Sequence, residues 1–115
     1  MGDSSMTTKV HLTRDPGTKE CPIEKTLNMI SGKWTFLIIR DLLIDGTLRF
    51  SDLRRSLSGI SPKTLSTRLK DLENKGIVSR TVYPEVPPRV EYSLTKKGRE
   101  LEDILLAMKA FGMTL

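Results

Sequence analysis

The sequence predicts a mainly α-helical fold with one small β-hairpin, and three observations lead to this prediction. Apolar residues recur every three or four positions through most of the chain, which is the spacing of amphipathic helices. Between residues 78 and 94 the apolar spacing shortens to every second position, which is typical of paired strands. The length of 115 residues, with 37% hydrophobic residues, suits one domain with one modest core.

The N-terminal part divides into an arm and a first helix. Residues 1–19 are polar and show no apolar period, which predicts a flexible arm ahead of a folded domain over residues 20–115. The helix is expected to begin at Cys21 and Pro22, because proline suits the first helical turn. Its apolar face is formed by Ile23, Leu27 and Ile30.

The next element is predicted to be the centre of the core. Residues 34–44 are apolar on nearly every side of a helix, and such helices are usually surrounded by protein. Asp45 and Gly46 follow with the chemistry of a turn, so the helix should end there.

Two further helices separated by a short turn are predicted from capping signals. Ser51 is expected to cap a short helix over residues 52–57, and Ser58 and Gly59 form the turn. Ser61 followed by Pro62 predicts the start of a helix over residues 61–74, which should end at Gly76. The inner stripe of this second helix consists of Leu65, Leu69 and Leu72.

A hairpin and a final helix complete the chain. The strands on either side of the proline-rich tip at residues 84–88 form the hairpin, and Thr95 is expected to cap a helix that continues to the C-terminus. This helix carries an apolar stripe close to a heptad pattern, for which a single small domain has no obvious use. We therefore expect a two-fold interface between two copies, formed by Ile23, Leu27, Ile30, Leu101, Ile104 or Leu105, Met108, Phe111 and Leu115. The alternative is that the stripe packs against the core of its own chain.

Two helices joined by a tight turn and followed by a hairpin form a winged helix-turn-helix, dimerising here through the first and last helices. In this arrangement the second helix presents polar and basic side chains to the edges of DNA bases. Basic residues before it and in the wing are suited to phosphates. The residues expected to contact DNA are Arg49, Arg54, Arg55, Ser61, Lys63, Thr64, Thr67, Arg68 and Arg89.

The distribution of charge agrees with a partner of double-stranded DNA. The chain has 19 Lys and Arg against 14 Asp and Glu, which gives a net charge of +5. Nine of these bases but only five of the acids lie in residues 61–100, within the second helix, the hairpin and the start of the last helix. Taken alone, this basic excess would describe an ordinary solvated surface.

Composition argues against several other classes. No apolar run approaches the roughly 20 residues of a membrane span, so no membrane partner and a cytoplasmic location are expected. One Cys and one His cannot form an internal disulfide framework or a zinc site, and we expect neither metal nor cofactor. An enzyme is disfavoured because His11, in the arm, is the one imidazole available to Cys21. A winged helix that binds protein without DNA remains the alternative function.

Three stretches resemble the HxlR-type winged-helix transcriptional regulators of bacteria. They are CPIEKTLNMISGKW, RFSDLRRSLSGISPKTLSTRLKDLENKGIVSR and YPEVPPRVEYSLTKKGREL, which together extend over most of the chain outside the arm. Ser31 departs from the glycine that the family prefers before Gly32. The resemblance implies a homodimer on a two-fold operator, with a recognition helix at residues 61–74 and a wing at residues 83–89.

The resemblance also bears on Cys21, the single cysteine of the chain. Some HxlR-type regulators respond to oxidants, quinones or aldehydes through the corresponding cysteine, which implies a small thiol or an electrophile as a partner of Cys21. A thiol at a helix N-terminus is favoured as thiolate, while Glu20 and Glu24 oppose this effect. The alternative is an inert structural cysteine.

Overall fold

The computed structural model describes residues 12–13 and 21–115. The flexibility expected of the arm at residues 1–19 therefore concerns residues that lie, except for two, outside the described part. No helix in the described residues is long and apolar enough to cross a membrane. The elements follow the order α1 (Pro22–Ile30), α2 (Lys33–Asp45), β1 (Thr47–Leu48), α3 (Phe50–Ser56), α4 (Pro62–Asn74), β2 (Val78–Tyr83), β3 (Arg89–Leu94), α5 (Lys96–Arg99) and α6 (Glu102–Gly112).

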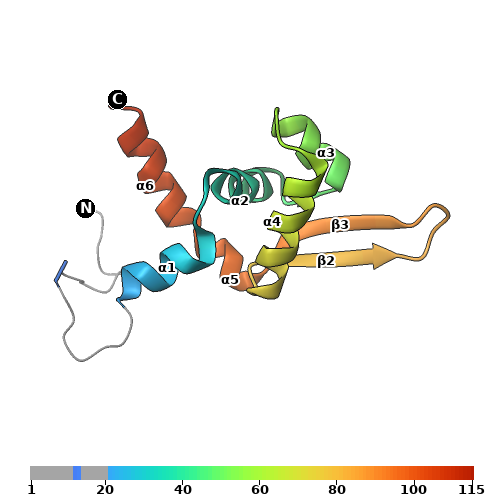
Figure 1. The fold of residues 1–115 in the computed structure, drawn as a ribbon, viewed down its shortest axis with the longest axis horizontal. Coiled ribbons are helices and arrows are strands. Elements are labelled where there is room, and N and C mark those ends of the chain that lie inside the picture. Colours follow the sequence, from blue (N-terminus) through green and yellow to red (C-terminus); the bar gives the residue numbers. More distant parts are fainter. Residues whose placement is uncertain (1–11, 14–20) are drawn as a thin grey trace.

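The predicted mainly helical fold with a hairpin is confirmed. α2 lies at the centre, and α3, α4 and α6 pack against it (Figure 1). The buried core combines residues of α2, α3 and α4 with the start of the hairpin. Its members are Ile30, Ile38, Ile39, Leu42, Leu53, Leu57, Ile60, Leu65, Leu69, Leu72, Ile77, Val78 and Leu94.

A short third strand extends the predicted hairpin into a sheet with the order β1-β3-β2, all antiparallel. β1 pairs Thr47 with Ser93 and Leu48 with Tyr92. Its two residues are too few to show an alternating pattern, which is why the sequence did not predict this strand. The strand ties the end of α2 to the base of the hairpin and so fixes the hairpin to the helical core.

Two boundaries in the sequence prediction were wrong. α3 begins at Phe50 rather than after Ser51, because the Asp52 side chain accepts a hydrogen bond from the Arg49 backbone N–H (2.9 Å) and thereby caps the helix two residues earlier. The final helix is not continuous from Thr95. The backbone N–H groups of Glu100 and Leu101 donate to carbonyls three residues back, and this tight turn separates α5 from α6.

The junction between the sheet and α5 is closely packed. Thr95 does cap α5, since its hydroxyl oxygen accepts from the Gly98 backbone N–H (3.0 Å) while the hydroxyl donates to the Gly76 carbonyl (2.6 Å). A Cβ atom added to Gly98 would overlap the carbonyl oxygen of Ile77. Only glycine therefore allows α5 to approach the backbone of Ile77, the residue before β2, this closely.

Candidate nucleic-acid interface

The recognition helix predicted at residues 61–74 begins and ends as expected. Ser61 is the N-cap of α4, and its hydroxyl oxygen accepts from the Thr64 backbone N–H (3.0 Å). The same hydroxyl donates to the Thr64 side-chain oxygen (2.9 Å). Gly76, with a positive φ of 76°, reverses the chain after the helix. The Ser61 and Thr64 hydroxyls are therefore occupied in holding the first turn of α4.

The two sides of α4 have opposite chemistry. Leu65, Leu69 and Leu72 are at most 2% exposed and attach the helix to the core. The opposite face presents Lys63 and Thr67, both exposed. Neither side chain makes a hydrogen bond or ion pair with any other part of the chain that the structure describes. The leucine stripe thus positions a polar surface that has no partner within the domain.

The outer face of α4 also carries Lys70, which was not among the residues predicted from sequence to contact DNA. Lys63, Thr67 and Lys70 are spaced four and three residues apart, so they share one helical face. All three are exposed. The signal for Lys70 in the sequence is its position three residues after Thr67 and seven after Lys63, on the same helical face. Arg68 lies on the flank of this face and is half-buried, beside Thr64.

The three arginines expected before α4 differ in how free their charges are. Arg49, Arg54 and Arg55 are all exposed. Arg55 is paired with Asp52 (Nη2 to Oδ1, 2.8 Å). The Arg49 backbone N–H and the Arg55 guanidinium lower the pKa of Asp52. Within the described residues the Arg49 and Arg54 guanidinium groups have no carboxylate partner, so these two are better placed to reach a phosphate.

The wing is an antiparallel hairpin that extends well beyond the helices, on the side of the molecule away from α1 and α6 (Figure 1). Arg89, the residue predicted to contact DNA from the wing, lies opposite Tyr83 in the register. Its guanidinium stacks on the Tyr83 ring (4.1 Å) and approaches Glu85 (3.2 Å) and Glu91 (3.6 Å). The Arg89 charge is therefore engaged inside the wing. Arg80 on β2, not predicted from sequence, is exposed.

The residues expected to form an interface between two copies fall into two groups. Ile23 and Leu27 on α1, and Met108 and Phe111 on α6, are all about half exposed or more. Leu101 and Leu105 are half-buried and pack against the chain's own core. For these two leucines the alternative expectation holds, namely that the apolar stripe of the last helix packs against the core of its own chain. Ile30 is a correction, since it is buried in the core and is not available to a second copy.

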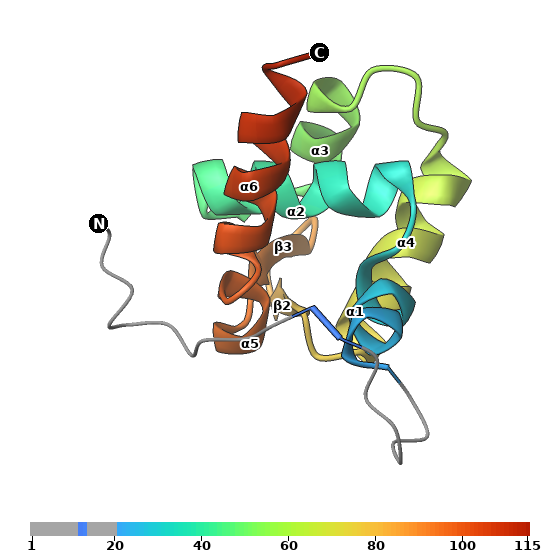
Figure 2. The same ribbon diagram turned by 90° about the vertical axis from the view of Figure 1, so that its left-hand side faces the viewer.

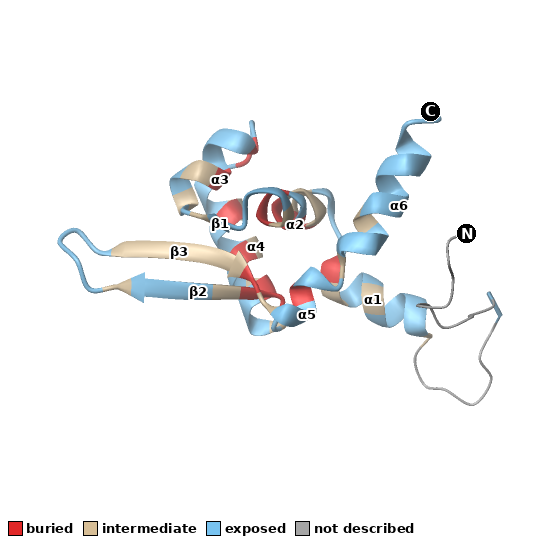
Figure 3. Ribbon diagram, turned by 180° about the vertical axis from the view of Figure 1, so that it is seen from behind, coloured by how far each residue is buried: buried red, intermediate tan, exposed pale blue. Residues whose placement is uncertain are grey.

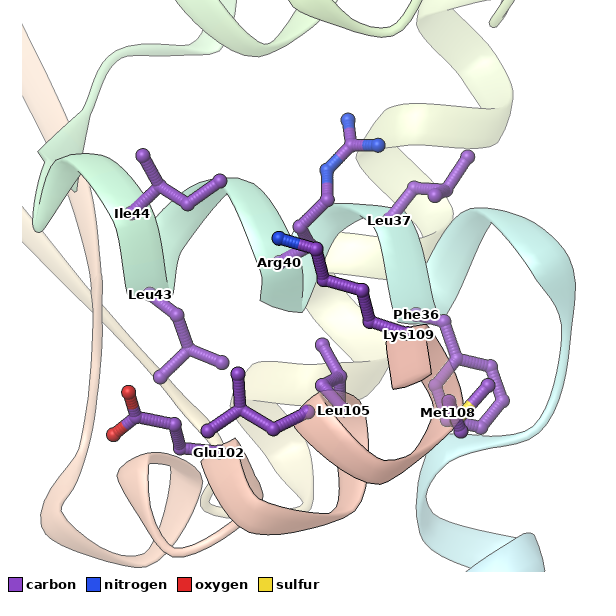
Figure 4. A pocket seen from close by; sticks show the side chains of 10 residues that line it. Phe36, Leu37, Arg40, Leu43, Ile44, Glu102, Leu105, Met108 and Lys109 are labelled. Carbon is purple, nitrogen blue, oxygen red and sulfur yellow. The ribbon is translucent and has the colours of Figure 1, made fainter. Parts of the chain in front are cut away.

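The side of the molecule opposite the wing is apolar and exposed. Figure 3 shows most of α6 exposed, although its sequence is largely hydrophobic. A groove of about 690 Å³ runs between α2 and α6, and Figure 4 shows apolar side chains from both helices along it. The lining residues include Phe36, Leu43, Leu105, Leu106 and Met108, with Arg40, Glu102 and Lys109 around them.

Cys21 is half-buried at the N-cap of α1, where its backbone N–H donates to Glu24 (3.4 Å). Figure 2 shows α1 beside the C-terminal end of α4, and the Lys75 ammonium donates there to the Asn28 carbonyl (2.6 Å). A change in the position of α1 would therefore alter a contact at the C-terminal end of α4. Within the described residues, no cluster of three or more metal-ligating side chains is present.

Comparison with known proteins places this arrangement in a family. Residues 29–115 match the model of a family described as HxlR-like helix-turn-helix. An uncharacterized HTH-type transcriptional regulator of Synechocystis sp. is 48% identical over 92 residues, which are 80% of this chain and 67% of that protein. YybR of Bacillus subtilis, described in the same way, is 47% identical over 97 residues, which are 84% of this chain and 77% of that protein.

Solved structures share the fold as well as the sequence. The redox regulator HypR in its oxidized form is 47% identical with a TM-score of 0.77, over 83% of this chain and 97% of that one. Diamide-treated YodB from B. subtilis is 37% identical with a TM-score of 0.69, over 85% of this chain and 97% of that one. The chain therefore belongs to the HxlR-like helix-turn-helix family, whose relatives named here are transcriptional regulators.

Proposed function

We propose that this protein is a sequence-specific DNA-binding transcriptional regulator that acts as a homodimer, in the cytoplasm, without catalytic activity. One observation carries the proposal: α4 is attached to the core by three buried leucines and turns an unpartnered polar and basic face outward. Helix-turn-helix proteins place a face of this kind in the major groove of DNA. Relatives at 46–48% identity carry the name of HTH-type transcriptional regulators.

Some residues of α4 would contact base edges, whereas others on α4 and α3 would contact phosphates. Lys63, Thr67 and Arg68 lie in the first two turns of α4, and their side chains suit guanine acceptors and the thymine methyl group. Lys70 lies further along the same face and suits the phosphate backbone. Arg54 projects from the preceding helix without a carboxylate partner among the described residues, which supports a second phosphate contact.

A homodimer is supported by the surface that the fold leaves apolar. α6 contains no buried residue, and Leu106, Met108 and Phe111 are all about half exposed or more. Monomers rarely expose apolar patches of this kind without a partner. The Cα radius of gyration of 16.4 Å exceeds the roughly 13 Å of a compact domain of about 100 residues, because α6 and the wing project outward. Two copies would cover these side chains and point two α4 helices at one DNA duplex.

Selection from a random pool of double-stranded DNA tests the proposal without knowledge of the target gene. The full chain is incubated with the pool at fixed salt, and bound DNA is sequenced over several rounds. We expect enrichment of a motif with two related half-sites one helical turn apart, or a multiple of it, as two α4 helices in a dimer require. Enrichment of no motif would favour the alternative of a winged helix that binds protein.

Regulation through Cys21 is the finer part of the proposal. Similarity to HypR, solved in oxidized and reduced forms, and to diamide-treated YodB supports a thiol response. Cys21 precedes the family match at residues 29–115, so the support comes from its partial exposure and its place at the N-cap of α1. Oxidation of two Cys21 thiols to one disulfide would pass two electrons and two protons to the oxidant, and requires Cα atoms within about 7 Å.

The thiol response is tested on the DNA selected above. Wild type and Cys21→Ser are titrated with that DNA before and after treatment with diamide, and again after a reductant. We expect diamide to change the affinity of wild type reversibly and to leave Cys21→Ser unchanged. Equal responses of the two proteins would assign Cys21 a structural role.

A further inference from the structure

Arg89 is the most heavily engaged of the basic residues expected to contact DNA. Its guanidinium lies over the Tyr83 ring at 4.1 Å and within 3.2 Å of the Glu85 carboxylate. Glu91 is two residues along the same strand, so its side chain projects from the same face of the hairpin as Arg89 and lies 3.6 Å from Arg89 Nε. One positive charge thus faces two negative charges at the end of the wing.

The ion pairs of Arg89 are incomplete. Arg89 Nε is buried without a hydrogen-bond partner, because Glu91 is too distant to accept one. Glu85 itself is half exposed at the tip. The pair is only partly buried, with the Arg89 side chain 30% exposed and the Glu85 side chain 50% exposed. Solvent weakens an ion pair at such a position, and a phosphate with good geometry competes with it. Arg89 is therefore held close to a position where it could contact DNA, by partners that a phosphate could replace.

Resting on the proposed function, we propose that Glu85 and Glu91 determine how much the wing adds to DNA binding, by competing with phosphate for Arg89. In the free protein Arg89 lies against the hairpin, in contact with Tyr83, Glu85 and Glu91. These four residues together carry a net charge of −1. On DNA the guanidinium exchanges Glu85 for a phosphate. The carboxylates of Glu85 and Glu91 thus weaken the binding of the wing to DNA of any sequence. Discrimination between DNA sequences then depends on α4.

Substitution of Glu85 by glutamine tests this competition, because it removes the charge and keeps the shape. Affinity for the selected DNA and for unrelated DNA is measured as a function of salt for the full-length protein. We expect Glu85→Gln to bind both about three- to fivefold more tightly, the range of a weak surface pair. The slope of log affinity against log salt should steepen toward one further phosphate contact. The matched control is Glu100→Gln. Glu100 is an exposed acid at the C-terminal end of α5, where it pairs with Lys97, and its substitution should change neither value.

A double-mutant cycle separates competition for Arg89 from simple repulsion between Glu85 and DNA. We expect the gain from Glu85→Gln to disappear when Arg89 is already alanine. A gain that persists in Arg89→Ala would overturn the proposal in favour of direct repulsion. Weaker binding by Glu85→Gln would overturn it too, since Glu85 would then position Arg89 for DNA. Failure of wild type to bind any DNA would be a different result, because it removes the proposed function together with this inference.

Discussion

α4 and α6 are helices of similar length, 13 and 11 residues, with opposite outward surfaces. α4 buries Leu65, Leu69 and Leu72 and exposes two lysines and one threonine. α6 buries no residue and exposes leucine, methionine and phenylalanine side chains. The apolar residues of α4 are buried in its own domain, whereas most of those of α6 are exposed in a single copy.

The difference favours a different kind of partner for each helix. A face of lysine and threonine gains little from contact with protein, but suits phosphates and base edges. A face of leucine and phenylalanine gains by leaving water, and a second copy of α6 offers the same chemistry in return. The groove between α2 and α6 continues this apolar surface onto the centre of the domain. One side of the molecule is thus suited to DNA and the other to protein.

The largest effect should follow from weakening the attachment of α4. Leu65→Ala removes a side chain that is fully buried between α4 and the core, so the free energy of unfolding should fall by about 2–5 kcal/mol. Ser66→Ala changes the exposed neighbour and should alter it by less than about 0.5 kcal/mol. Urea denaturation followed by circular dichroism measures both. Equal stability of the two variants would mean that α4 is not held by its leucine stripe.

The corresponding substitution on α6 should affect assembly instead of folding. Phe111→Glu places a charge in the proposed interface, and we expect the dimer dissociation constant to rise at least about thirtyfold, the effect of a central interface residue. The melting temperature of the dissociated monomer should stay close to that of the wild-type monomer, since Phe111 is 68% exposed within one copy. Asp103→Asn is an exposed control on the same helix.

Sedimentation equilibrium over a range of protein concentrations gives the dissociation constant for each protein. A wild type that sediments as a 13.0 kDa particle at micromolar concentration would contradict the dimer. A variant that unfolds would show that the apolar face of α6 serves its own domain, as Leu101 and Leu105 do.

A smaller effect is expected on the polar face of α4. Arg68→Ala should weaken binding to the selected DNA by about 1–3 kcal/mol and relax the preference for one base pair, because a bidentate contact to a base would be lost. Lys25→Ala removes one positive charge from α1, outside α4 and the wing, and controls for net charge. Competition binding with single-base variants of the DNA measures the preference. Uniform weakening across all sequences would assign Arg68 to the phosphate backbone.

Much of the fold could be predicted because its signals are local. Ser61, Pro62 and Gly76 determine the ends of α4 within a few residues of sequence. The change in apolar spacing predicted the hairpin, and the structure confirms it, with β2 paired to β3 from Val78 to Tyr83. β1 could not be predicted in this way, because its pairing with β3 is the property that makes it a strand.

The candidate site was predicted less completely, and for a related reason. Local spacing identified Lys63, Thr67 and Arg68, and it could also have given Lys70. The engagement of Arg89 depends on the register across the hairpin and on the chain path through the tip, which bring Glu85 to its guanidinium. A list of basic residues counts Arg89 and Arg54 alike, although the structure leaves their charges in different states.

The smallest expected effect concerns α3, where one of the arginines predicted to contact DNA, Arg55, is paired with Asp52 of the same helix. Hydrogen bonds from the Arg49 backbone N–H and the Arg55 guanidinium hold the pKa of Asp52 below its usual value near 3.8. In the unfolded chain these donors are absent, so Asp52 binds a proton more readily there. The stabilisation is therefore complete above the unfolded pKa and is lost as pH falls through the lower folded pKa.

Unfolding free energies of wild type and Asp52→Asn, measured between pH 7 and pH 3, test this linkage. We expect a constant difference from pH 7 to about pH 5 and a shrinking one toward pH 3, as wild-type Asp52 becomes protonated. Arg55→Gln should keep part of this pH dependence, because the backbone N–H of Arg49 is the larger cause of the lowered pKa. A difference that stays constant down to pH 3 would mean that Asp52 does not cap α3, and that Arg55 is as free to reach DNA as Arg54.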